Sequence, residues 1–293
     1  MVGRELGRRL AVAAVGIPLT LVVIFLGGWV LAGVMGVVAA LMAREFYRIG
    51  RARDVDAFTW IGIPASGALV LMGGAHSSFS HAAPWAMALL MSTLLLSFAA
   101  AVWLRGSDGR PMAAVGTTVA GTLYGGGALS FAVFLRHLPD AGGAGGGDLP
   151  LQGTALLAFP LAVTWVGDSA AYLLGRRYGR RKLIPSVSPG KTVEGGVASL
   201  VASILTGGGL GWFLLQLHPE PLLSALLGGG VGLALAVGAQ VGDLAESVMK
   251  REAGVKDSGS LLPGHGGAMD RFDALVFNLP LTYALVSLIG FLS

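Results

Sequence analysis

Charged residues of both signs alternate within one short segment near the C-terminus of this chain. The segment contains six carboxylates and four cations, among them Asp243, Glu246, Lys250, Arg251, Lys256, Asp270, Arg271 and Asp273. Long apolar stretches lie on both sides of it, and charges in or beside membrane helices are costly, so they are seldom without a function. Carboxylates bind hard metal ions and cations bind phosphates, so this composition predicts a site that holds both.

The spacing of the carboxylates places them on helix faces. Asp243 is followed by Glu246 and Ser247, three and four residues later, and Asp270 is followed by Asp273 at the same spacing of three. Residues three or four apart lie on one face of a helix. Mg²⁺ prefers oxygen ligands and keeps several waters, so two helix ends that each offer carboxylates are suited to bind it.

An alternative interpretation is structural. Asp243, Asp270, Glu246 and Asp273 could instead form salt bridges, with Arg251 or Arg271 as the partner. A further carboxylate, Asp168, lies inside another apolar stretch, about two turns from its end. A lone carboxylate there needs a metal ion or a buried cation as its partner.

A second segment is suited to bind an anion. Gly190-Lys191-Thr192 has the ending of a phosphate-binding P-loop, but Pro185 stands where the first glycine is required and no strand precedes it. The weaker interpretation is a turn around Ser188 that leads into a helix whose N-terminus carries Lys191 and Thr192.

One histidine, the four lysines and most of the arginines also indicate roles from their positions in the sequence. His265 lies between glycines inside the charged segment, which favours a role in the site. All four lysines of the chain lie in its C-terminal half, and an ammonium group is a good point charge for phosphate. Most of the arginines, Arg48 among them, are interpreted as cations that determine membrane topology.

The composition is that of an integral membrane protein. Of the 293 residues 54% are hydrophobic and only 12% are charged, whereas a soluble domain has roughly 25% charged residues. The chain has no cysteine, which excludes disulfides and thiolate metal sites. Its pI of about 9.7 is explained by basic loops on the cytoplasmic side, so nucleic acid is not expected as a partner.

The apolar stretches predict an all-α bundle of about nine transmembrane helices. A membrane-spanning helix needs about 20 apolar residues. Such windows occur at 10–27, 29–43, 58–75, 84–104, 113–135, 154–175, 193–215, 222–248 and 272–292. The chain is interpreted as one membrane domain, residues 1–293, with few charges in helices of the first part (1–150) and the catalytic helices and loops in the second (151–293).

The basic residues predict the orientation. With the N-terminus in the cytoplasm, every lysine and arginine except Arg136 falls on the cytoplasmic side. This asymmetry follows the positive-inside rule and requires an odd number of helices, so the C-terminus is expected outside. The protein should therefore lie in the inner (plasma) membrane, with its charged segments facing the cytoplasm.

The charged segment resembles the signature of the phosphatidate cytidylyltransferases, or CDP-diacylglycerol synthases. The signature matches at Ser247, Lys250, Arg251, Lys256, Asp257, Leu262, Pro263, His265, Gly266, Gly267, Asp270, Arg271 and Asp273. Upstream matches are Gly167, Asp168, Ala171, Tyr172, Gly175, Arg176, Ser188, Pro189, Lys191, Thr192, Glu194 and Gly195. The resemblance therefore extends from about Leu161 to the C-terminus.

The resemblance implies transfer of a cytidylyl group from CTP to phosphatidic acid, with Mg²⁺ alone or Mg²⁺ together with a second metal ion. The metal ligands would be Asp243, Asp270, Asp168 and Asp273. The catalytic residues would be Asp243, Asp270, Lys250, Arg251, Glu246 and His265. The substrate-binding residues would be Lys191, Thr192, Ser188, Ser247, Lys256 and Arg271.

Two other functions remain as alternatives. A homodimer is a further expectation. A transporter of an anionic substrate would have its site near the midplane between repeated halves, whereas the charges here crowd one face of one half. A different CTP-dependent lipid enzyme, such as a polyprenol kinase, would lack the signature described above. The glycine-rich helices are compatible with a homodimer, because small residues let helices approach closely.

Overall fold

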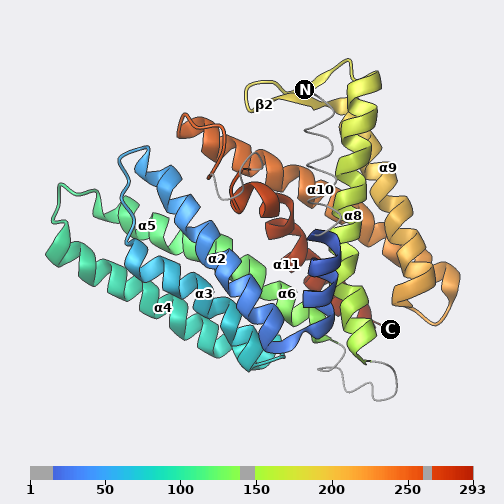
Figure 1. Ribbon diagram of the computed structural model, residues 1–293, viewed down its shortest axis with the longest axis horizontal. Coiled ribbons are helices and arrows are strands. Elements are labelled where there is room, and N and C mark those ends of the chain that lie inside the picture. The colour runs from blue at the N-terminus through green and yellow to red at the C-terminus, as the bar shows by residue number, and fades with distance from the viewer. Residues whose placement is uncertain (1–15, 139–148, 260–265, 293) are drawn as a thin grey trace.

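The computed structural model describes residues 16–138, 149–259 and 266–292, and its regular structure is almost entirely helical (Figure 1). The helices are Gly16–Leu26, α2 (Gly28–Arg51), α3 (Thr59–Ala75), α4 (Phe79–Leu104), α5 (Pro111–Thr122), η1 (Leu123–Gly127), α6 (Ala128–Arg136), α8 (Leu149–Tyr178), α9 (Val193–Leu210), η2 (Gly211–Leu215), α10 (Pro221–Glu252) and α11 (Met269–Leu292). Two short strands, β1 (Lys182–Ile184) and β2 (Ser188–Thr192), form an antiparallel hairpin.

A helix occupies each of the nine apolar windows. The segments α5, η1 and α6 form one continuous helical stretch, as do α9 and η2, because η1 and η2 are single π-helical turns. Within the described residues, seven helices are long and apolar enough to cross a membrane. The two shorter ones are Gly16–Leu26 and α3. The all-helical membrane fold is confirmed, while nine crossings and the orientation stay predictions.

Helix α2 continues well beyond its apolar window. It ends at Arg51, beyond the window at 29–43 and beyond Phe46, to which we expected that the helix could extend. Its additional residues include Glu45 and Tyr47, which are polar but buried. The Tyr47 hydroxyl donates to the carbonyl of Thr118 at 2.8 Å, which joins α2 to α5. Hydropathy alone therefore underestimates the length of a helix whose polar residues have partners inside the bundle.

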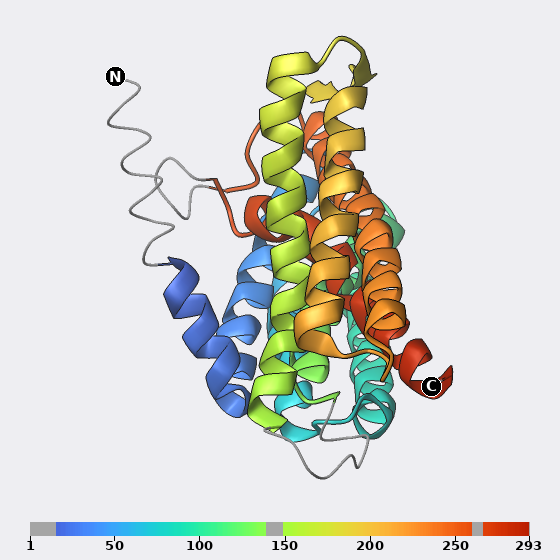
Figure 2. The same ribbon diagram turned by 90° about the vertical axis from the view of Figure 1, so that its right-hand side faces the viewer.

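Helix α11 lies between two groups of helices. Helices α2 to α6 form one group and α8 to α10 the other, and α11 contacts α6, α8 and α10 (Figure 1). The hairpin lies at one end of the molecule and the C-terminal end of α11 at the other (Figure 2). We call the hairpin end, where α2, α8 and α10 finish and α11 begins, the charged end.

Helices α9 and α10 pack through glycines. A Cβ atom at Gly207 would collide with the carbonyl of Gly228, and one at Gly211 would lie 2.5 Å from the carbonyl oxygen of Ser224. Such contacts require the absence of a side chain. These glycines are therefore used for packing within the chain, and the homodimer stays a prediction.

Arg136, the exception in the distribution of basic residues, has a structural role. Its side chain is 6% exposed and donates to the carbonyl oxygens of Ile24 at 2.8 Å and Phe25 at 2.9 Å. These are carbonyls of the last turn of helix Gly16–Leu26, which have no partner within that helix. Arg136 thus stabilises a helix end with its charge buried.

Candidate active site

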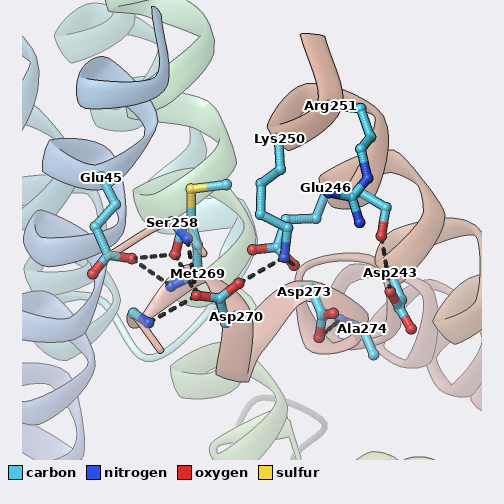
Figure 3. A network of polar contacts seen from close by, with 12 residues as sticks. Glu45, Asp243, Glu246, Lys250, Arg251, Ser258, Met269, Asp270, Asp273 and Ala274 are labelled. Carbon is cyan, nitrogen blue, oxygen red and sulfur yellow. Dashed lines mark hydrogen bonds and ion pairs between the residues drawn. The ribbon is translucent and has the colours of Figure 1, made fainter. Parts of the chain in front are cut away.

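Asp270 is the most heavily hydrogen-bonded carboxylate at the charged end (Figure 3). Its Oδ1 atom accepts from the Lys250 Nζ atom at 2.6 Å. Its Oδ2 atom accepts from the Ser258 backbone N–H at 3.0 Å, the Ser258 hydroxyl at 2.8 Å and the Gly267 N–H at 2.8 Å. A carboxylate has about four lone-pair positions, so these four donors use most of its capacity.

The glycines before α11 allow this close approach. Gly266 has φ of +80°, a conformation that disfavours other residues, and a Cβ atom there would lie 2.7 Å from Oδ2 of Asp270. A Cβ atom at Gly267 would collide with the carboxylate of Glu45 and the hydroxyl of Ser258. Gly266 and Gly267 are therefore required because the carboxylates of Asp270 and Glu45 lie too close to leave room for a side chain.

Glu45 belongs to this network, although sequence reasoning missed it. It comes from α2 and is only 8% exposed. Its carboxylate accepts from the N–H groups of Ala268 at 3.0 Å and Met269 at 2.8 Å (Figure 3). Its Oε2 atom also lies 3.0 Å from the Ser258 hydroxyl, whose single proton is shared between Glu45 and Asp270. The first N–H groups of a helix have no hydrogen-bond partner within that helix. The carboxylate of Glu45, which belongs to α2, accepts from them and so caps α11.

A signal for Glu45 was present in the sequence. It is the only acidic residue between Glu5 and Asp54, and it follows an apolar stretch directly. The argument that charges at the edge of membrane helices are functional applies to it as it does to Asp243. We applied that argument only to the C-terminal part of the chain.

Lys250 bridges two carboxylates. Besides Asp270, its Nζ atom contacts Oε2 of Glu246 at 3.1 Å. Glu246 is 1% exposed, and its Oε1 atom has no hydrogen-bond partner among the described residues. A buried polar atom of this kind is expected to have a partner in the functioning protein.

Asp243 lies apart from Asp270, and its partner is Lys191. Lys191 Nζ lies 2.7 Å from Asp243 Oδ2, and the Ser247 hydroxyl lies 3.4 Å from Asp243 Oδ1. The structural alternative named Arg251 or Arg271 as partners of Asp243 and Asp270, and this was wrong, since lysines hold both positions.

Three carboxylates from different helices lie within electrostatic range of one another. They are Asp168 of α8, Asp243 of α10 and Asp273 of α11, and the charge of Asp243 acts on the other two. Asp168 makes no hydrogen bond or ion pair to any described residue, although the charge of Lys191 also reaches it. In the described parts of the chain, no three carboxylate or histidine side chains converge closely enough to hold a metal ion alone.

The segment with Lys191 is a hairpin rather than the simple turn we expected. Lys182 pairs with Thr192, and Ile184 pairs with Ser188. The Thr192 side chain then accepts from the Gly195 N–H at 3.1 Å and caps α9. A helix does begin directly after this segment, with Thr192 as its N-cap, but Lys191 belongs to strand β2 and not to the helix N-terminus that we expected to carry it.

The hairpin also contacts the end of α10. The Nε atom of Arg251 donates to the carbonyl of Val187 at 3.3 Å. Together with the Lys191–Asp243 pair, this contact brings the two predicted phosphate-binding segments side by side.

The remaining predicted residues lie at the charged end or outside the described residues. Lys256 and Arg271 have exposed side chains at the charged end, and Ser188 is half-buried in the hairpin. His265 lies outside the described residues, so its role stays a prediction. The catalytic, substrate-binding and metal-binding assignments as a whole likewise stay predictions.

Comparisons with known proteins show the family to which such a chain is similar. The model of the cytidylyltransferase family matches residues 7–289. A protein of Synechocystis sp. named phosphatidate cytidylyltransferase is 35% identical over 298 residues, which cover 96% of this chain and 97% of that protein. A protein of Bacillus subtilis with the same name is 41% identical over 141 residues, about half of each chain (48% and 51%). One of Staphylococcus aureus is 40% identical over 136 residues, or 46% of this chain and 50% of that one.

Proposed function

This chain belongs to the cytidylyltransferase family, and we propose that it transfers the cytidylyl group of CTP to phosphatidic acid. The products are CDP-diacylglycerol, a precursor in phospholipid biosynthesis, and pyrophosphate. The observation that carries the proposal is that carboxylates of α8, α10 and α11 lie within electrostatic range of one another, beside Lys191 and Lys250, at one end of a membrane bundle. The full-length similarity to a relative named for this activity supports it.

The reaction brings two polyanions together. An oxygen of the phosphatidate phosphate forms a bond to the α-phosphorus of CTP. The bond from that phosphorus to the oxygen bridging to the β-phosphate breaks, and pyrophosphate leaves with the bonding electrons. The attacking phosphate is already anionic, so no side chain has to act as the nucleophile. Catalysis then consists mainly of positioning and charge stabilisation.

Lys191 and Lys250 are placed to supply positive charge. Each amino group now contacts a carboxylate of the site, Asp243 in one case and Asp270 with Glu246 in the other. A bound phosphate would compete for these ammonium groups, and charge-assisted hydrogen bonds are the stronger ones. We propose that Lys191 contacts the triphosphate and that Lys250, Arg251 and Thr192 complete the anion site.

We propose Mg²⁺ as the cofactor, and the residues present fit it. Mg²⁺ is usually held by one or two carboxylates together with substrate phosphates, so a site of three protein ligands is not required. The carboxylates Asp168, Asp243 and Asp273 lie within electrostatic range and repel one another, which favours a cation near them. When bound, the ion would neutralise phosphate charge and polarise the phosphoryl oxygens.

Asp270 has a different environment from the other predicted ligands. Its oxygens already accept four hydrogen bonds. We therefore propose that Asp243 is the main ligand, with Asp168 and Asp273 beside it, and that Asp270 chiefly positions Lys250 and Ser258.

Replacing Lys191 with alanine should lower kcat/KM for CTP at least about tenfold. A charge-assisted phosphate contact is worth roughly 1.5–3 kcal/mol, and 1.36 kcal/mol corresponds to a factor of ten. Lys182→Ala is the matched control, because Lys182 is an exposed lysine on the other strand of the hairpin. Equal kcat/KM values for Lys191→Ala and Lys182→Ala would contradict the role of Lys191.

We further propose nine membrane crossings, with the N-terminus and the charged end in the cytoplasm and the C-terminus outside. The helices found in all nine windows and the distribution of basic residues support this topology. Reporter fusions after Arg105, Asp148 and Ser293 should report inside, outside and outside. A fusion after Asp148 that reports a cytoplasmic location would exclude the nine-helix topology.

The function itself is tested with the purified full-length protein, CTP, Mg²⁺ and phosphatidic acid. We expect pyrophosphate to be released only when phosphatidic acid is present, in equal amount to the CDP-diacylglycerol formed. Pyrophosphate release that does not depend on phosphatidic acid would exclude this assignment.

A further inference from the structure

A cavity of about 540 Å³ lies between the end of α2 and the beginning of α3. Three arginines of α2 line it, namely Arg44, Arg48 and Arg51. From the sequence, Arg48 was interpreted as a cation that only determines topology. A topology signal requires positive charge on one side of the membrane, but it does not require that the charges line a cavity.

The arginines lie on one face of α2. Their spacings of four and three residues bring the guanidinium groups together, where like charges destabilise a helix. Asp56 compensates Arg51, with 2.7 Å between Oδ1 and NH2. Arg44 and Arg48 form no hydrogen bond or ion pair with any residue in the described ranges, so two positive charges at the cavity lack a protein counterion.

The carboxylate in the cavity wall forms no ion pair with either arginine. Glu45 lines the cavity too, but its oxygens accept from the N–H groups of Ala268 and Met269 and from the Ser258 hydroxyl. Two unmatched guanidinium groups at i and i+4 are suited to bind a phosphate, because each can offer paired N–H donors.

The rest of the lining indicates which kind of phosphate fits. Leu41 and Ile63 contribute apolar surface to the same cavity. Both α2 and α3 are apolar helices of a membrane bundle. An apolar helix ends where the hydrocarbon core of the bilayer ends, so we infer that the end of α2 and the beginning of α3 lie at the level of lipid headgroups. A ligand with a phosphate beside an apolar part matches this lining.

We propose that this cavity binds the phosphate headgroup of an anionic phospholipid, with the phosphate on Arg44 and Arg48 and the glycerol and first acyl carbons against Leu41 and Ile63. The site is separate from the lysine–aspartate pairs, but it shares Glu45 with the cap of α11. The inference rests on the membrane fold and the cavity, and it holds whether or not the proposed reaction is correct.

Protection of a single cysteine from modification tests the proposal at the cavity itself. The chain has no cysteine, and Thr59 lines the cavity, so Thr59→Cys introduces one reporter thiol. We expect short-chain phosphatidic acid to slow its reaction with a water-soluble maleimide at least about fivefold. Phosphatidylcholine of the same chain length, and inorganic phosphate at the same concentration, should slow it less than twofold.

Matched arginine variants locate the binding groups. Adding Arg44→Gln and Arg48→Gln should abolish the protection. Adding Arg53→Gln should leave it unchanged, because Arg53 is an exposed arginine two residues beyond α2 that does not line the cavity. If the double glutamine variant does not fold, Arg44→Lys with Arg48→Lys keeps the charge and topology signal but removes the paired donors, and should weaken the protection.

Three outcomes would overturn the proposal. The first is no protection by phosphatidic acid in the Thr59→Cys protein. The second is equal protection in folded Arg44→Gln, Arg48→Gln protein, which would leave these arginines as topology cations. The third is equal protection by inorganic phosphate, which would make the cavity a site for free phosphate rather than for a lipid.

Discussion

The Asp243→Asn protein should be folded but inactive, with kcat reduced at least about a thousandfold. The substitution keeps the size of the side chain and removes the charge that we propose binds the metal ion. Charge stabilisation by a metal ion contributes several kcal/mol to phosphoryl chemistry, and each 1.36 kcal/mol corresponds to a factor of ten. Asp243 is half-exposed, so its loss should have little effect on the thermal unfolding temperature.

A matched control is available on the same helix. Glu252 is the last residue of α10, is exposed and makes no hydrogen bond or ion pair to another described residue, so Glu252→Gln should keep normal activity. The readouts are turnover with CTP and phosphatidic acid, and thermal unfolding in detergent. Near-normal turnover in a well-folded Asp243→Asn protein would exclude Asp243 as a metal ligand.

Replacing Glu45 with alanine should impair both stability and activity, although Glu45 lies in the half of the chain with few charges. The substitution leaves the N–H groups of Ala268 and Met269 without their acceptor, and the Ser258 hydroxyl loses one of its two acceptors. A buried group without a partner costs about 1–3 kcal/mol, so the loss for the two N–H groups should be about 2 kcal/mol or more. Ser258 also donates to Asp270, so the site should lose its geometry and turnover should fall.

The conservative variant Glu45→Gln separates the effect of capping α11 from the effect of the negative charge. Glu45→Gln keeps one acceptor oxygen, so it should recover part of the stability lost in Glu45→Ala when both are measured by thermal unfolding. A Glu45→Ala protein with wild-type unfolding temperature and wild-type turnover would contradict the assigned cap.

The helices could be located from the sequence because an apolar run long enough to cross a bilayer is a local property. The residues that share a helix face could be predicted in the same way from their spacing. This predicted that Asp243 and Ser247 lie on one face. The ends were less well predicted, as α2 shows, because the burial of Glu45 and Tyr47 depends on partners in other helices.

The contacts of the site could not be predicted, because they join distant parts of the chain. Glu45 and Ala268 are 223 residues apart, and no local pattern encodes their hydrogen bond. The salt-bridge partners were misassigned for the same reason. Sequence proximity favoured Arg251 and Arg271, whereas the hairpin delivers Lys191 to Asp243.

The hairpin itself was missed because its strands have three and five residues. Strands this short are defined by their pairing rather than by a hydrophobic pattern. The cavity beside Arg44 and Arg48 was missed because the positive-inside rule already accounted for those arginines.

The fate of each phosphate of CTP tests the proposed function most directly. The purified protein is incubated with Mg²⁺ and phosphatidic acid, and with CTP labelled with ³²P at either the α- or the γ-phosphate. Cytidylyl transfer predicts that the α-label enters the lipid extract and that the γ-label stays in the aqueous phase as pyrophosphate. Entry of the γ-label into the lipid would identify a CTP-dependent lipid kinase instead, and absence of both labels from the lipid would contradict the transfer.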